Sequence, residues 1–173
     1  MAARLVHGYV DAPGAPGGAR RRVLAALATL MLAPVARAHH GWSSFDQSRP
    51  IYLAGTVRAV RWANPHAELE LEPNPEWQLP RDLSKRPVPA QQAPVDVAAL
   101  LAASALPRRR DKLWTVELAP LTRMQAWGVE PLKVGEAIEL VGFTFREERG
   151  DAVVRVEYLF RGGKAYALRS SPA

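Results

Sequence analysis

The sequence predicts an all-β fold, mainly antiparallel, in which five strands form a small barrel with one short helix between the third and fourth strands. Past Pro50 the apolar residues recur mostly with the period of β-strands. One compact helical pattern interrupts them, and it falls after the third of five such segments. This order is that of an OB-fold, a five-stranded Greek-key barrel. A small open β-sandwich is the competing architecture.

The first two predicted strands form a hairpin. Residues 51–62 (IYLAGTVRAVRW) are rich in β-branched and aromatic side chains, and Gly55 indicates a bulge or tight bend. Asn64-Pro65 marks the turn, because a residue before proline is pushed out of the helical region. Residues 66–72 then alternate strictly, so we expect the leucines to face the core. The solvent-facing positions are Glu68, Glu70 and Glu72.

Residues 73–111 differ in composition from the predicted barrel. They contain seven prolines and the basic run Arg108-Arg109-Arg110, with one helix-permissive piece at residues 95–106. A connection this long is either functional or loosely ordered, and its composition favours loose order. We therefore treat residues 73–111 as a Pro-rich insertion between the second and third strands.

The third strand and the short helix follow the insertion. Residues 112–119 (KLWTVELA) form the strand, and residues 121–127 form the helix between Pro120 and Gly128. Proline early in a helix and glycine just past its end are the expected asymmetry. The core-facing side of this strand consists of Trp114, Val116 and Leu118.

Two further strands complete the predicted barrel. Residues 136–146 and 152–160 run antiparallel, and residues 164–168 add a short edge piece. Gly142, in the middle of the first of these strands, suits the sharp bend that a small closed barrel needs. The barrel domain spans residues 51–168, preceded by an amino-terminal segment at 39–50 and followed by a carboxy-terminal tail at 169–173.

The amino-terminal 38 residues have the parts of a secretory signal peptide. Three arginines, Arg20 to Arg22, precede an apolar core at residues 23–36, and the triplet Ala36-Arg37-Ala38 provides a cleavage site. The core is shorter than the roughly 20 residues of a membrane-spanning helix. We expect a periplasmic protein with no stable membrane span after cleavage; a retained amino-terminal anchor is the alternative.

Cleavage would change the charge of the molecule. The precursor has 23 basic and 17 acidic residues, and five and one of these lie in the signal peptide. The mature chain is therefore close to neutral, which argues against a nucleic-acid partner. The chain has no cysteine, so neither disulfides nor thiolate chemistry are available.

The mature chain has three histidines, and they are the candidate metal ligands: His39, His40 and His66. As the new terminal residue, His39 would offer its amino and ring nitrogens to one ion. Such nitrogen donors suit Cu(II) first and Zn(II) second, and Asp46 could add an oxygen. The alternative interpretation is that His39 and His40 begin a flexible tail and His66 caps its turn.

The tryptophans suggest a second kind of site. Trp114 and Trp127 are expected in the core, whereas Trp62, with Asn64 in the adjoining turn, is a candidate interaction surface. No set of nucleophile, base and orienting residue can be assembled from the sequence, so we do not expect an enzyme.

Several stretches resemble the DUF6152 family of exported bacterial proteins of unknown function. The most specific are the His39-His40 start after the signal and the Trp62-Ala63-Asn64-Pro65-His66 turn. The others are Gly41 to Asp46, Gly55-Thr56-Val57 and Val141-Gly142-Phe143. The resemblance implies a periplasmic, β-barrel-like domain and mildly favours the metal hypothesis. The insertion at 73–111 departs from the shorter family pattern.

Together these features predict a periplasmic binding or accessory module that holds a transition metal. A protein-interaction or structural module with a periplasmic protein partner is the alternative. The third candidate, an oligonucleotide- or oligosaccharide-binding barrel, requires exposed aromatic residues on the second and third strands.

Overall fold

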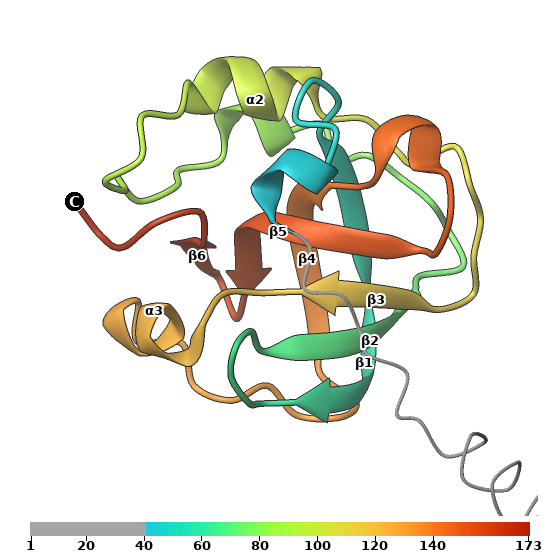
Figure 1. The fold of residues 1–173 in the computed structure, drawn as a ribbon. Helices are drawn as coiled ribbons and strands as arrows, with labels where there is room; N and C mark the ends of the chain where they lie inside the picture. The colour runs from blue at the N-terminus through green and yellow to red at the C-terminus, as the bar shows by residue number, and fades with distance from the viewer. Residues whose placement is uncertain (1–40) are drawn as a thin grey trace, which may run out of the picture. The chain divides into compact units, whose positions relative to one another are not determined.

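The computed structural model describes residues 41–173, so the predicted signal peptide and both His39 and His40 lie outside the described residues. The described part consists of six strands and a few short helices (Figure 1). The strands are β1 (Ile51–Arg61), β2 (Glu68–Pro73), β3 (Trp114–Glu117), β4 (Ala137–Phe143), β5 (Val153–Arg161) and β6 (Lys164–Ala167). The helical segments are η2 (Trp42–Ser44), η3 (Leu83–Lys85), α2 (Val97–Ala103), α3 (Leu121–Ala126) and η4 (Arg146–Glu148).

Five of the strands close into a barrel. The sheet order is β3-β2-β1-β4-β5-β6, and β3 also pairs with β5, which joins the two sides of the sheet. The β3–β5 pairing is parallel and the other pairings are antiparallel. β6 lies outside the barrel as a hairpin partner of β5. The predicted five-stranded, OB-like barrel is confirmed, with α3 between β3 and β4 as expected.

The barrel interior is filled by alternate side chains of the five barrel strands, β1 to β5. Trp114, Val116 and Leu118 are almost completely buried, as their common phase predicts. Met124 of α3 joins the same cluster, so the short helix contributes to the core beyond β3. Gly128 ends this helix with a positive φ of 63°, a conformation that glycine adopts without steric cost.

Two glycines permit close contact between neighbouring strands. A Cβ on Gly55 would lie 2.2 Å from the carbonyl oxygen of Glu72, and one on Gly142 would lie 2.3 Å from that of Arg155. Gly142 also lies at a register shift between β4 and β5, which is the predicted bend. The bulge in β1 falls between Val57 and Ala59, so Gly55 serves the approach of β2 and is not itself the bulge.

The insertion at residues 73–111 is packed on the barrel, so the expectation of loose order is wrong. Leu83 of η3 and Leu101 of α2 are buried against a cluster on the outside of the barrel that includes Tyr52, Val141 and Tyr158. These outward-facing side chains are apolar or aromatic and favour a cover that removes them from water. The prolines shape a folded excursion whose side chains supply that cover.

Glu148 fastens the far end of the insertion to the loop between β4 and β5. Its carboxylate accepts the backbone N–H groups of Arg108 and Arg109, each at 2.9 Å, and pairs with the Arg49 guanidinium. Burial alone would raise the pKa of Glu148, but these donors outweigh it and hold the pKa below its usual value. The basic run of the insertion is thus held in place by one buried carboxylate.

We predict that Gly142→Ala destabilises the barrel. The added Cβ would meet backbone of β5 that cannot move without breaking strand pairing, and overpacking of this kind costs about 3 kcal/mol in the free energy of unfolding. Urea denaturation measures the loss. The matched control is Gly41→Ala, whose Cβ would make only an ordinary contact at 3.8 Å. Equal stability of the two variants would contradict the proposed close approach.

We predict that Glu148→Gln lowers stability at neutral pH by about 2 kcal/mol, because charge-assisted hydrogen bonds are replaced by weaker ones. The pKa of Glu148 is lowered by folding, so its stabilisation is present above the unfolded pKa and is lost as pH falls through the folded pKa. The difference between wild type and variant should therefore shrink below about pH 4.

The control for this measurement is Glu72→Gln, since Glu72 pairs with Arg58 while both side chains remain about half exposed. Exposed pairs of this kind contribute little to stability. Chemical denaturation between pH 3 and pH 8 compares the three proteins. A pH-independent effect of Glu148→Gln would show that the carboxylate charge is not what fastens the insertion.

Candidate functional site

A row of four charged residues crosses the outside of the barrel. Arg61 of β1 lies opposite Glu68 of β2, Glu68 opposite Glu117 of β3, and Glu117 opposite Arg155 of β5. Residues directly opposite one another in paired strands share a face of the sheet. The charges along the row are therefore positive, negative, negative and positive. We call these four residues the charged row: Arg61, Glu68, Glu117 and Arg155.

Each carboxylate of the charged row has an arginine beside it. Arg61 Nε donates to Glu68 at 3.1 Å, and Arg155 Nη1 donates to Glu117 at 3.3 Å. The Arg61 side chain is 40% exposed, whereas the other three side chains of the row are less than 10% exposed, with Arg155 at 5%. Two adjacent glutamates would repel one another, and the flanking arginines offset this repulsion.

The prediction that all three glutamates of β2 face solvent is wrong for one of them, Glu68. Glu72 is exposed and Glu70 half-buried, but Glu68 is buried and not directed at solvent. Alternation correctly places Glu68 on the outer face, and the arginine opposite it allows burial there. Strand periodicity reports the face of a sheet but not what covers that face.

His66 is bonded to both ends of the charged row. Its Nε2 lies 3.0 Å from Nη2 of Arg155, and its carbonyl oxygen accepts from Arg61 at 3.3 Å. A guanidinium can only donate, so Nε2 is the acceptor and the ring proton resides on Nδ1. Burial lowers the pKa of Arg155, with Glu117 opposing this effect, yet the group remains a cation.

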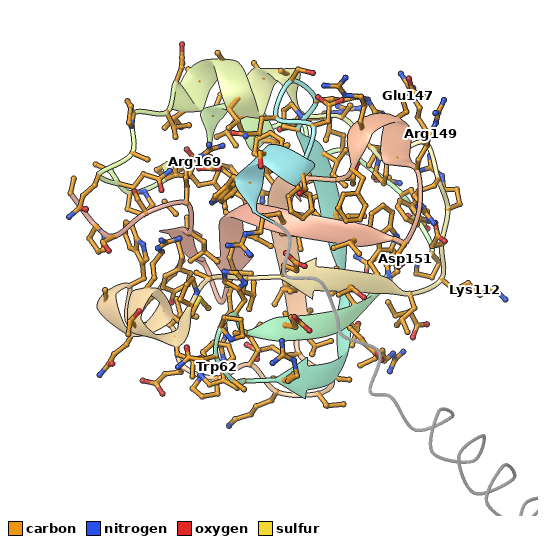
Figure 2. The ribbon with its side chains drawn as sticks, viewed as in Figure 1. Trp62, Lys112, Glu147, Arg149, Asp151 and Arg169 are labelled. Atoms are coloured by element: carbon orange, nitrogen blue, oxygen red, sulfur yellow. The ribbon has the colours of Figure 1, made fainter. Side chains whose placement is uncertain are left out.

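Trp42 covers the buried end of the charged row. Arg155 and Arg169 lie over its ring, with guanidinium carbons 5.3 Å and 4.4 Å from the ring centroid. Phe143 meets the same ring edge-on at 6.2 Å. Figure 2 shows Arg169 beside the η2 segment that carries Trp42. The chain just after His40 is thus fastened to the outer face of β5 by cation–π contacts.

Another buried carboxylate, that of Glu157, lies next to this cover. Glu157, at the register shift of β5, has no exposed surface and accepts from Arg169 at 2.7 Å and from Gln91 at 2.8 Å. Burial raises the pKa of Glu157 even though Arg169 opposes the shift. One carboxylate therefore joins β5, the insertion and the carboxy-terminal segment.

Only part of the predicted metal site lies within the described residues. His66 is half-buried and engaged with Arg155, whereas His39 and His40 fall outside the described residues. Asp46, the suggested oxygen donor, accepts from both the backbone and the hydroxyl of Ser48. Among residues 41–173, no three His, Asp or Glu side chains are grouped to hold a metal ion.

The predicted interaction surface is divided. Trp62 is half-buried and packs against the main core, at the lower edge of the barrel in Figure 2. Asn64 is exposed, and its Oδ1 accepts the backbone N–H of Leu121 at the start of α3. Sequence reasoning missed Trp42, Glu117, Arg155 and Arg169 as members of one cluster. Each looked unremarkable alone, because no local pattern shows that they meet.

These features define a small β-barrel whose outer face carries a buried charged row. A family model described as a family of unknown function, DUF6152, matches residues 27–77. The match confirms the predicted resemblance over that stretch, which includes Trp42, His66 and Glu68. No curated protein and no solved structure matches the chain significantly. None of the helices found in residues 41–173 is both long and apolar enough to cross a membrane.

We predict that Arg155→Met lowers the free energy of unfolding by about 3 kcal/mol, because it removes the cation between a buried carboxylate and His66. Adding Glu117→Gln should recover part of the loss, giving a coupling of about 1–3 kcal/mol in a double-mutant cycle. NMR of the ring nitrogens should show Nδ1-protonated His66 in the wild type and a mixture of tautomers in Arg155→Met.

Arg58→Met is the matched control for Arg155→Met, since it removes an arginine whose ion pair with Glu72 is about half exposed. We expect its effect on stability to be close to zero. Additive losses in the cycle, or an unchanged His66 tautomer, would contradict the proposed role of Arg155.

Proposed function

We propose that this protein is exported to the periplasm and is a binding module, not an enzyme, that holds one transition-metal ion at its mature amino terminus. Copper is the first candidate metal and zinc the second. The ligands in this proposal are the amino and ring nitrogens of His39, the ring of His40 and the ring of His66. The observation that supports it most is that Trp42 and His66 contact the same guanidinium, that of Arg155.

The covalent chain limits how far the two amino-terminal histidines can be from that guanidinium. Two peptide units separate His40 from Trp42, so their Cα atoms are at most about 7 Å apart. Trp42 in turn lies against Arg155, whose Nη2 bonds the His66 ring. A metal ion needs its nitrogen ligands at about 2 Å, so the proposal requires the rings of His39 and His40 to reach that of His66.

The charges beside His66 suit a bound cation only if the Arg155 guanidinium releases the His66 ring. Glu68 and Glu117 supply two carboxylates of the charged row, whereas Arg155 of the same row occupies Nε2, one of the two ring nitrogens that could bind a metal. We therefore propose an order: the amino-terminal nitrogens bind first, and His66 joins when Arg155 releases its ring. Groups that hydrogen-bond to the ligands of a metal ion change its affinity about 10- to 100-fold.

The family match is consistent with the proposed processing. It begins at residue 27, inside the apolar core of the predicted signal peptide, and runs through the cleavage triplet to the turn that holds His66. The junction and the turn are thus parts of one matched stretch. That arrangement supports a shared role for the His-His start and His66, and the role we propose is metal binding.

The test begins with the protein exported by its own cells. Mass spectrometry of the purified chain should show that it starts at His39. Calorimetric titration with Cu(II) should then show one site. His39→Ala with His40→Ala should weaken binding about 100-fold or more, and His66→Ala about tenfold, since His66 competes with Arg155 for its place.

The mature chain contains no other histidine, so these variants account for every imidazole. Asp46→Asn is the matched control, because Asp46 is occupied by Ser48 and should leave affinity unchanged. A processed chain that starts elsewhere would remove the amino-terminal ligand. Copper affinity that is unaltered by loss of all three histidines would favour the alternative, an interaction module that uses Trp62 and Asn64.

A further inference from the structure

A large cleft lies on the outside of the barrel, between its wall and the first half of the insertion. The cleft is lined by residues of β1, β4 and the β5–β6 hairpin and by residues 74–87 of the insertion. Its volume is about 1040 Å³, at the upper end of the range found for small-molecule sites. His66 and the charged row do not line this cleft.

The cleft is open because the barrel wall carries small residues there. Side chains that could fill the space between wall and insertion are missing at six positions. The β5–β6 hairpin also turns through two glycines with positive φ, which adds no side chain at the mouth. The six small residues are Ala54, Gly55, Ala137, Gly162, Gly163 and Ala165.

Apolar surface lines part of the cleft. Leu79 is 42% exposed and adds apolar side-chain surface to the lining. Phe160 contributes a ring, over which Arg86 lies at 5.3 Å. Three prolines of the insertion add further apolar edges: Pro75, Pro80 and Pro87. An apolar body of a ligand would remove this surface from water.

The charged groups of the cleft are unevenly compensated. Arg86 is paired with both Asp82 and Glu139, at 3.1 Å and 2.6 Å. Arg161 is paired with Glu136. These arginines are therefore already neutralised by carboxylates and are poor candidates to attract a ligand.

Two other cations of the cleft remain available. The side chains of Arg81 and Lys164 are exposed and form no ion pair or hydrogen bond with any other residue in the described range 41–173. Arg81 comes from the insertion and Lys164 from the start of β6. Glu76 is the one lining carboxylate that no arginine or lysine of the described chain pairs with. Once Glu136 is counted as the partner of Arg161, the charges at the cleft balance, so an anion would be attracted by the two available side chains and not by a net positive charge.

We infer that the cleft binds a small amphipathic anion, a molecule with an apolar body and one acidic head group. The body lies on the small-residue wall against Leu79 and Phe160. The head lies between Arg81 and Lys164, which supply opposite charge. The cleft and the proposed metal ligands share no residue, so each can be tested without the other.

The probe is decanoate, and decylamine serves as a ligand of the same length with the opposite charge. Titration calorimetry on the mature protein should show decanoate binding about tenfold more tightly than decylamine. Amide NMR shifts on adding decanoate should be largest at Ala54, Gly162 and Gly163. Equal affinity for the two probes, or shifts spread over the whole surface, would overturn the inference.

Two variants and one control locate the head group and the body. Arg81→Gln with Lys164→Gln should weaken decanoate binding about tenfold, while Lys112→Gln with Lys133→Gln, the same charge change away from the cleft, should not. Ala165→Trp fills the wall and should abolish binding in a protein that remains folded by circular dichroism. Retained binding in both cleft variants would rule out this site.

Discussion

The burial of Arg155 is the constraint on which much of this structure depends. β5 directs Val154 and Val156 into the barrel, so Arg155 faces outward, yet the residue is only 4% exposed. A buried cation is tolerated only when it is paired and hydrogen-bonded. Glu117 supplies the charge, His66 supplies a nitrogen acceptor and Trp42 supplies a ring face. Loops that precede β1 and follow β1 are thereby fixed by one side chain of β5.

The same constraint explains why segments outside the barrel are ordered on it. Glu157 next to Arg155 is buried as well, and its partners Arg169 and Gln91 belong to the carboxy-terminal segment and the insertion. Arg169 also lies over the Trp42 ring, so the two clusters share a member. The insertion, the chain end and the η2 segment cover the outer face of β5 together. A change at any one of them exposes charge that the others bury.

Sequence periodicity was sufficient to predict the barrel but not the segments that pack on its outer face. The phase of Trp114, Val116 and Leu118 predicted their burial, and Gly142 predicted the bend, because these depend on local geometry. Arg155 and His66 are 89 positions apart in the chain, and only the closed barrel brings them together. The prediction of loose order for the insertion was wrong for a related reason. Its prolines suggested loose order, but the insertion packs on the apolar outer face of the barrel around Tyr52 and Tyr158.

The two proposed sites lie on faces of the barrel that are built by different means. The His66 turn and Trp42 belong to the stretch that matches the family model, whereas most of the insertion that walls the cleft lies beyond residue 77. The barrel strands contribute to both sites. They supply the paired charged residues beside His66 and the small residues that line the cleft. The outer positions of the strands thus determine what each face can bind, while the inner positions only close the barrel. The proposed ligand His66 therefore belongs to the matched stretch, whereas the cleft depends on an insertion that lies mostly outside it.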